Sequence, residues 1–113
     1  MPIPPTIQNV VDQLNQELNR IEQKTIEGLN LARELLSRFP NNAILTQYFA
    51  YFNTALVFVE TSRSQIQIIL EAISLTDVPD ELIQNAGQDL GNLLGRMLEV
   101  KLKVGRLIER LKE

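Results

Sequence analysis

The sequence LLSRFPNNAILTQYF, residues 35–49, decides the fold. Its first part ends a segment with helical apolar spacing, and its last part begins another segment of the same kind. Pro40 separates the two, because proline lacks a backbone N–H and disfavours the helical region for the residue before it. Asn41 and Asn42 offer side chains that can cap the start of a new helix. The stretch therefore predicts a helix end, a short connection and a helix start.

The remaining prolines divide the rest of the chain in the same way. They lie at the start of the sequence and at Pro79, which leaves three segments at about 6–38, 42–75 and 78–112. In each segment the apolar residues recur with 3-4-3-4 spacing, which is typical of an amphipathic helix, and no segment shows convincing strand alternation. Three helices of nearly equal length are therefore expected.

Polar residues beside the breaks predict where these helices begin. Thr6 is the expected cap of the first helix, and Thr76 or Asp77 is the expected cap of the third. Asp80 and Glu81 would then lie in the first turn of the third helix, where acidic side chains complement the positive end of the helix dipole.

Length and spacing together predict the architecture. Each helix would be about 50 Å long at 1.5 Å per residue, and short connections make consecutive helices antiparallel neighbours. Heptad spacing over at least four cycles favours left-handed coiled-coil packing. We predict an all-α single domain over residues 1–113: a proline-rich lead at 1–5, then an elongated up-down-up antiparallel three-helix bundle. A break near Gly87 would give four helices instead.

The residue types that are absent exclude most catalytic sites. The 113 residues include no Cys, His or Trp, so ordinary zinc, haem and iron–sulfur sites and Ser-His-Asp or Cys-His catalysis cannot be built. A site for Mg²⁺ or Ca²⁺ built from carboxylates alone is still possible with the residue types present. However, Glu17, Glu22 and Glu27 recur every five residues, which spreads them around a helix. We therefore assign no catalytic, cofactor-binding or metal residue and expect a protein that is not an enzyme.

Charge and hydropathy predict a soluble cytoplasmic protein. The net charge is −3, from 14 acidic and 11 basic residues, which argues against nucleic-acid binding. The longest apolar run, residues 55–59, is far shorter than the ~20 residues of a membrane span, and the N-terminus lacks the regions of a secretory signal. Basic residues gather at 96–113, where they complement the helix dipole and solvate the surface. Phosphate or nucleic-acid binding and an acidic protein partner are the alternatives for this basic segment.

Aromatic residues mark one end of the predicted rod. All of them lie in a single part of the chain, and they are Phe39, Tyr48, Phe49, Tyr51, Phe52 and Phe58. Aromatic rings bury large areas, and tyrosine combines an apolar ring with a polar edge, so these residues are candidates for an interface or a ligand site. Three explanations remain open: a wider core at that end, an oligomer interface, or a pocket for an apolar ligand.

The segment from Ile44 to Leu75 is unusually poor in charge. It contains only Glu60, Arg63 and Glu71, although a surface helix normally keeps a charged face. Uncharged polar side chains cost less to cover with a partner than charged ones do. The second helix is therefore expected to be buried on more than two sides. Three helices cannot enclose it fully, so the pattern points to self-association.

Small residues form a stripe on the third helix. Gly87, Gly91 and Gly95 are four residues apart, and Leu98 and Gly105 continue the same side. Each glycine costs about 0.8–1 kcal/mol relative to alanine inside a helix, so an offsetting role is expected. The alternatives are an exposed or kinked turn that tolerates glycine, close packing within the bundle, and close packing against a second subunit.

These features favour one functional hypothesis. We expect a non-enzymatic helical-bundle interaction or scaffold module that self-associates, with a dimer favoured over larger assemblies, and that needs no cofactor. Another protein is a further possible partner. The alternative is a binder of an apolar small molecule or a lipid surface, which would use the aromatic end.

Overall fold

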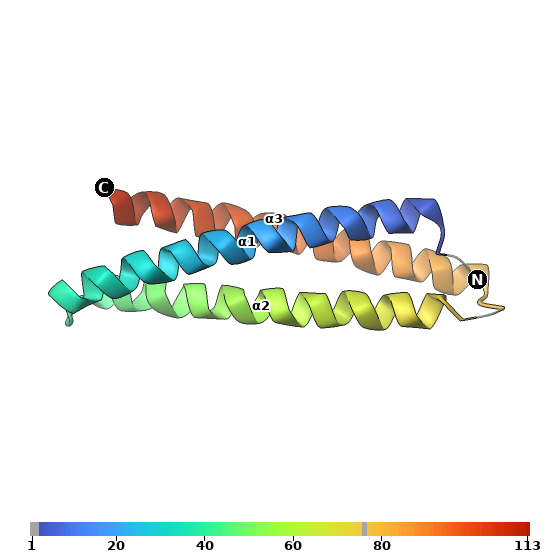
Figure 1. Ribbon diagram of the computed structural model, residues 1–113, viewed down its shortest axis with the longest axis horizontal. Coiled ribbons are helices and arrows are strands. Elements are labelled where there is room, and N and C mark those ends of the chain that lie inside the picture. The colour runs from blue at the N-terminus through green and yellow to red at the C-terminus, as the bar shows by residue number, and fades with distance from the viewer. Residues whose placement is uncertain (1–2, 76) are drawn as a thin grey trace.

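The computed structural model describes residues 3–75 and 77–113, which form three helices: α1 (Pro5–Arg38), α2 (Ala43–Ile73) and α3 (Asp80–Lys112). Figure 1 shows them running up, down and up in a rod that measures 59 × 18 × 17 Å. The predicted all-α three-helix bundle is confirmed. The four-helix alternative is wrong, because α3 continues without a break through Gly87.

The start of α2 follows the sequence prediction, whereas the start of α1 does not. Asn42 caps α2, since its Oδ1 accepts hydrogen bonds from the backbone N–H groups of Ile44, at 3.0 Å, and Leu45, at 3.1 Å. Thr6 is not a cap, because α1 already begins at Pro5. Proline suits the first position of a helix, where its missing N–H would have no partner in any case.

The start of α3 also differs from the expectation. Asp77 is not the cap; it lies in the turn before the helix with a φ of 59°, and Pro79 occupies the cap position. The physical reason is that Pro79 disfavours helical geometry at the residue before it, so the helix cannot begin earlier. Asp80 and Glu81 lie in the first turn, as predicted. The other predicted cap, Thr76, and residues 1–2 of the predicted lead lie outside the described residues.

The core is formed by the apolar side of each of the three helices and has two clusters. The larger cluster fills the end where α3 begins, and its members are Ile7, Val11, Leu14, Leu18, Ile21, Val59, Ile66, Ile73, Ala86, Leu90, Leu93 and Met97. The smaller cluster fills the other end, and its members are Leu29, Ala32, Phe52, Ala55, Val104, Leu107 and Ile108. Thr25 is fully buried on the apolar side of α1, and in sequence it lies between the α1 members of the two clusters.

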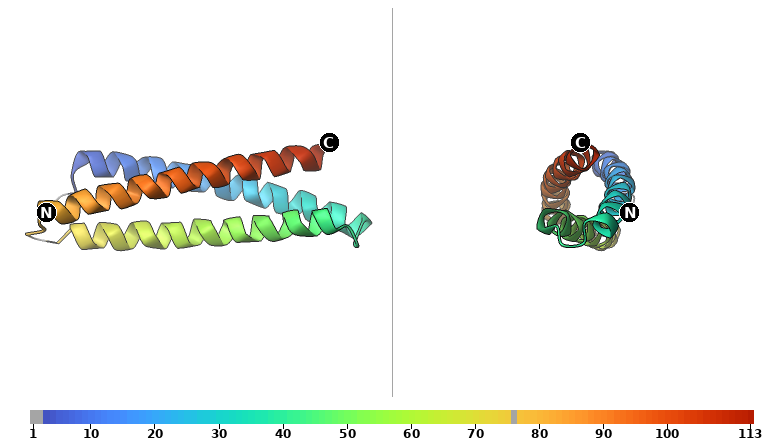
Figure 2. Two further views of the ribbon diagram at one scale, coloured as in Figure 1. Left: turned by 180° about the vertical axis from the view of Figure 1, so that it is seen from behind. Right: turned by 90° about the vertical axis from the view of Figure 1, so that its left-hand side faces the viewer.

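The two ends of the rod differ in shape. Figures 1 and 2 show α2 and α3 close together where α3 begins and farther apart toward the C-terminus. The α1–α2 turn projects beyond the last residue of α3. The end of the rod that holds the α1–α2 turn is therefore the wider one. Only α1 and α2 form its outermost part. Apart from Phe58, which packs against the larger cluster, the aromatic residues lie at this end.

Candidate functional site: an interaction surface

One of the aromatic residues, Phe52, belongs to the core, and Phe58 packs against it. Phe52 has no exposed surface, and its ring lies against Gly28 of α1. Phe58 is half-buried and packs against the larger cluster. The Phe52 ring fills space inside the wide end, as the wider-core explanation expects, whereas Phe58 packs against the cluster of the other end.

Three further aromatic residues are half-buried beneath cationic side chains. Lys103 Nζ lies 4.3 Å from the centre of the Tyr51 ring, and Arg33 Cζ lies 5.9 Å from the centre of the Phe49 ring. Arg110 donates a 3.4 Å hydrogen bond to the Tyr48 hydroxyl. Cations over aromatic faces are attracted by the ring quadrupole. Burial also raises the pKa of Tyr51. Each of these three aromatic residues is therefore in contact with a long basic side chain.

Phe39 behaves differently from the other aromatic residues. It is 56% exposed at the α1–α2 turn, and the neighbouring Ile44 is 60% exposed. Phe39 is the C-cap of α1, and Ile44 is the second residue of α2. Of the predicted aromatic residues, Phe39 is thus the one that most fully faces solvent.

The glycine stripe of α3 faces open space. A Cβ atom built on Gly87, Gly91, Gly95 or Gly105 would meet no atom within 4 Å, so close packing within the bundle does not explain these glycines. Leu98 continues the stripe and is 43% exposed. The sequence interpretation missed Leu102, which is 64% exposed; its four-residue spacing from Leu98 could have identified it.

The outward face of α2 carries few charges. Val57 and Ile68 are exposed at 60% and 62%, and the side chains between and beside them are mostly uncharged. A shallow hollow on this face is lined by Glu60, Thr61, Ser64, Gln65 and Ile68. Glu60 is the one charged group in that lining. The helix is about 46 Å long, so the surface extends over most of the rod.

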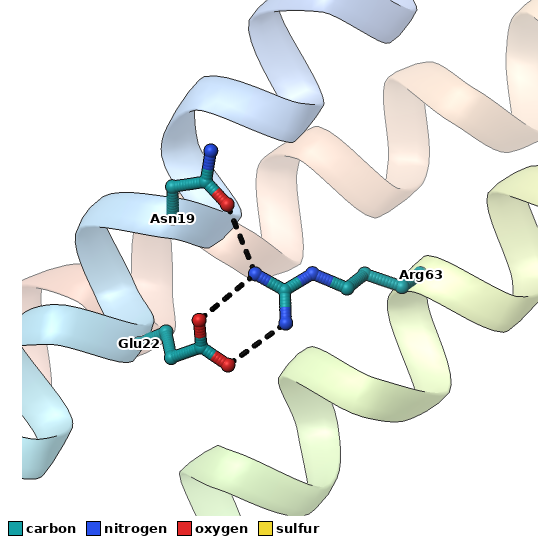
Figure 3. Close-up of polar contacts among 3 residues, drawn as sticks. All are labelled: Asn19, Glu22 and Arg63. Atoms are coloured by element: carbon teal, nitrogen blue, oxygen red, sulfur yellow. Dashed lines mark hydrogen bonds and ion pairs between the residues drawn. The ribbon is translucent and has the colours of Figure 1, made fainter.

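Arg63, the one basic residue of α2, is turned away from this face and toward α1. Figure 3 shows its guanidinium clamped between Glu22 and Asn19. It donates hydrogen bonds of 2.8 and 3.1 Å to the two Glu22 oxygens and one of 2.9 Å to Asn19. This paired geometry is the strongest that arginine makes with a carboxylate, and it lowers the pKa of Glu22. The clamp fixes α1 against α2 and removes a charge from the outward face.

Two other glutamates of α1, Glu17 and Glu27, bind α3. Glu17 is 7% exposed, and its carboxylate lies 2.9 Å from Lys101 Nζ and 2.7 Å from Arg20 Nη1. Glu27 lies 3.0 Å from Lys112 Nζ and 3.5 Å from Lys24 Nζ. Lys101 first, and then Arg20, lower the pKa of Glu17 despite its burial, and Lys112 does the same for the pKa of Glu27. Several C-terminal basic residues therefore hold α3 to its neighbours.

Acid is expected to destabilise the bundle through these three glutamates. Each has a folded pKa below its ordinary value of 4.5, so each binds a proton more weakly in the folded chain than in the unfolded chain. Their contribution to stability is complete above that ordinary value and is lost as the pH falls through the folded pKa. The thermal midpoint should fall from neutral pH to about pH 3, and it should fall less steeply in Glu22→Gln. A midpoint that stays constant or rises in acid would contradict this expectation.

No helix of the described residues is long and apolar enough to cross a membrane. Within residues 3–75 and 77–113, no group of three or more acidic side chains is placed to hold a metal ion. Glu17, Glu22 and Glu27, which recur every five residues along α1, pair with different basic residues. A scan against protein-family models gave no match, and searches of curated proteins and of solved structures found no similar chain.

Proposed function

We propose that this chain is a cytoplasmic, non-enzymatic helical-bundle interaction module that forms a dimer through the outward face of α2. The observation that carries the proposal is the exposure of Val57 and Ile68 on a face whose other side chains are almost all uncharged. Covering such a face removes apolar surface from water at about 25 cal/mol per Å². It does so without the larger cost of stripping water from several charges.

Charge also favours a second copy of the same chain as the partner. In a twofold dimer the same face meets itself, so a charged face would place like charges together. From Ala43 to Val59, α2 carries no charged residue at all, and Arg63 is already paired with Glu22 on α1. From Ala43 to Val59 this face can therefore meet its own copy with little electrostatic penalty, and Glu60 and Glu71 are the carboxylates that the dimer must keep apart. The exposed glycines of α3 add a second surface that a neighbouring backbone could approach closely.

The alternative function, an apolar ligand or lipid bound at the aromatic end, has less support. Phe52 is enclosed in the core, and Tyr48, Phe49 and Tyr51 are in contact with basic side chains. Binding through these rings would first have to break those contacts. Phe39 and Ile44 remain as an exposed apolar pair, which is a small area for a lipid surface.

Cysteine cross-linking tests the proposed face directly, because the chain has no natural cysteine. Val57 lies near the middle of α2, and a twofold axis through the centre of the α2 face would bring it close to its own copy. Val57→Cys should then give a covalent dimer with a short bifunctional maleimide. Asn30→Cys, on the exposed side of α1, is the matched control and should remain largely monomeric under the same conditions. Equal cross-linking of the two variants, or none at Val57→Cys, would count against the α2 face.

A further inference from the structure

A hollow between α1 and α3 is separate from the outward face of α2, the aromatic end and the glycine stripe. It has a volume of about 320 Å³, and it is lined by Arg20, Ile21, Gln23, Lys24, Glu27, Lys101 and Val104. Ile21 and Val104 are buried and form its apolar floor. The hydrocarbon stems of the lysine and arginine residues add further apolar surface, as such side chains do when their charged ends reach water. Its size is at the lower end of the range for small-molecule sites.

The charges around this hollow do not balance. Arg20, Lys24 and Lys101 line it together with a single carboxylate, Glu27. Two acids, Glu17 and Glu27, are paired with four cations, the three lining ones and Lys112. The group therefore keeps a formal excess of two positive charges. An anion would reduce this excess, whereas a cation would increase it.

The cations are held at the site before any ligand arrives. The nearly buried Glu17 fixes Arg20 and Lys101 from two different helices at distances of 2.7 and 2.9 Å. Lys24 is the least constrained of the three, since it is 3.5 Å from Glu27 and its side chain is 62% exposed. Each ammonium and guanidinium group has more N–H donors than these contacts use. A pre-positioned set of donors lowers the ordering cost of binding.

We infer that the α1–α3 hollow binds a small amphipathic anion, a carboxylate attached to a short hydrocarbon chain. The carboxylate would take free N–H donors of Lys24, Lys101 and Arg20. The hydrocarbon chain would cover Ile21 and Val104 at the floor. This inference does not depend on dimer formation, because it rests on α1 and α3 and leaves the outward face of α2 untouched.

Calorimetric titration of the whole protein with sodium octanoate tests the inference. We expect saturable binding near one octanoate per chain. Acetate, which lacks the hydrocarbon chain, and octyltrimethylammonium, which has the opposite charge, should not bind. Lys24→Gln should weaken octanoate binding about tenfold, the effect of losing one charge-assisted hydrogen bond. Since Lys24 is exposed and loosely paired, this variant is expected to fold, which circular dichroism would verify.

Arg106→Gln is the matched control, because it removes the same charge from an exposed residue of α3 that does not line the hollow. Its octanoate affinity should equal that of the unaltered chain. The inference is overturned if octanoate does not bind saturably, if octyltrimethylammonium binds equally well, or if the two variants weaken binding to the same extent. None of these results bears on the dimer, so the two proposals fail independently.

Discussion

Replacing Phe52 by alanine is expected to lower the free energy of unfolding by about 3–5 kcal/mol. Phe52 has no exposed surface and is the largest side chain of the smaller core cluster. Its removal would leave a cavity at the wide end of the bundle, where α2 and α3 diverge (Figure 2). Chemical denaturation followed by circular dichroism measures the change.

Phe39→Ala is the control for this substitution. It removes the same ring from a position that is 56% exposed, and exposed substitutions usually change stability by no more than about 0.5 kcal/mol. Similar losses for the two variants would mean that the aromatic residues do not divide into a core member and a surface member as described.

Gly28→Ala is expected to destabilise the protein by about 1–2 kcal/mol, although alanine is the better helix former. A Cβ atom at Gly28 would lie 2.5 Å from Phe52 Cζ and within 2.8 Å of two further ring atoms. Overpacking of this kind costs about 1–3 kcal/mol, which outweighs the gain of up to about 1 kcal/mol in helix propensity. Denaturation midpoints would give the sign. Combining Gly28→Ala with Phe52→Leu should make the alanine less costly, because the ring it meets is gone.

Gly91→Ala is the matched control and should have the opposite sign. Its built Cβ meets nothing within 4 Å, so only the helix propensity changes, and stability should rise by up to about 1 kcal/mol. If both alanine variants were stabilising, the close contact between Gly28 and Phe52 would be refuted. If both were destabilising, the open environment of Gly91 would be refuted.

The helices and their order could be predicted because strong local rules decide them. Pro40 and Pro79 interrupt a chain whose apolar residues otherwise keep helical spacing, and Asn42 caps α2 as its side chain allows. The caps of α1 and α3 could not be predicted as well. At both places a proline and a polar residue compete for the helix start, and the backbone restriction of the proline prevails over the side-chain hydrogen bond of Thr6 or Asp77.

The candidate surfaces were predictable only in part. The poverty of charge in α2 is visible in the sequence, and its exposed Val57 and Ile68 follow from helical spacing. The roles of the aromatic residues are not visible, because the separation of α2 and α3 decides which rings are enclosed. The surroundings of the glycines are not visible in the sequence either. Gly28, on the apolar side of α1, is packed against the Phe52 ring. A Cβ atom on any glycine of the regular stripe from Gly87 to Gly95 would meet nothing within 4 Å.

The α1–α3 hollow could not be found from the sequence. Its lining comes from residues about 80 positions apart, and its charge excess depends on which basic residues of α3 reach α1. Sequence alone assigns those basic residues to the helix dipole and the solvent. The contacts of Lys101 and Lys112 with α1 depend on the register between α1 and α3, which run parallel. The sequence alone does not reveal that register.

The molar mass of the unaltered chain in solution tests the central proposal most directly. Sedimentation equilibrium over micromolar to millimolar concentrations should give a mass that rises to twice the 12.9 kDa of one chain. The double variant Val57→Glu/Ile68→Glu should keep the mass of one chain, because it places charges on the face that the dimer would bury. A mass of 12.9 kDa for the unaltered chain at the highest concentration would contradict self-association.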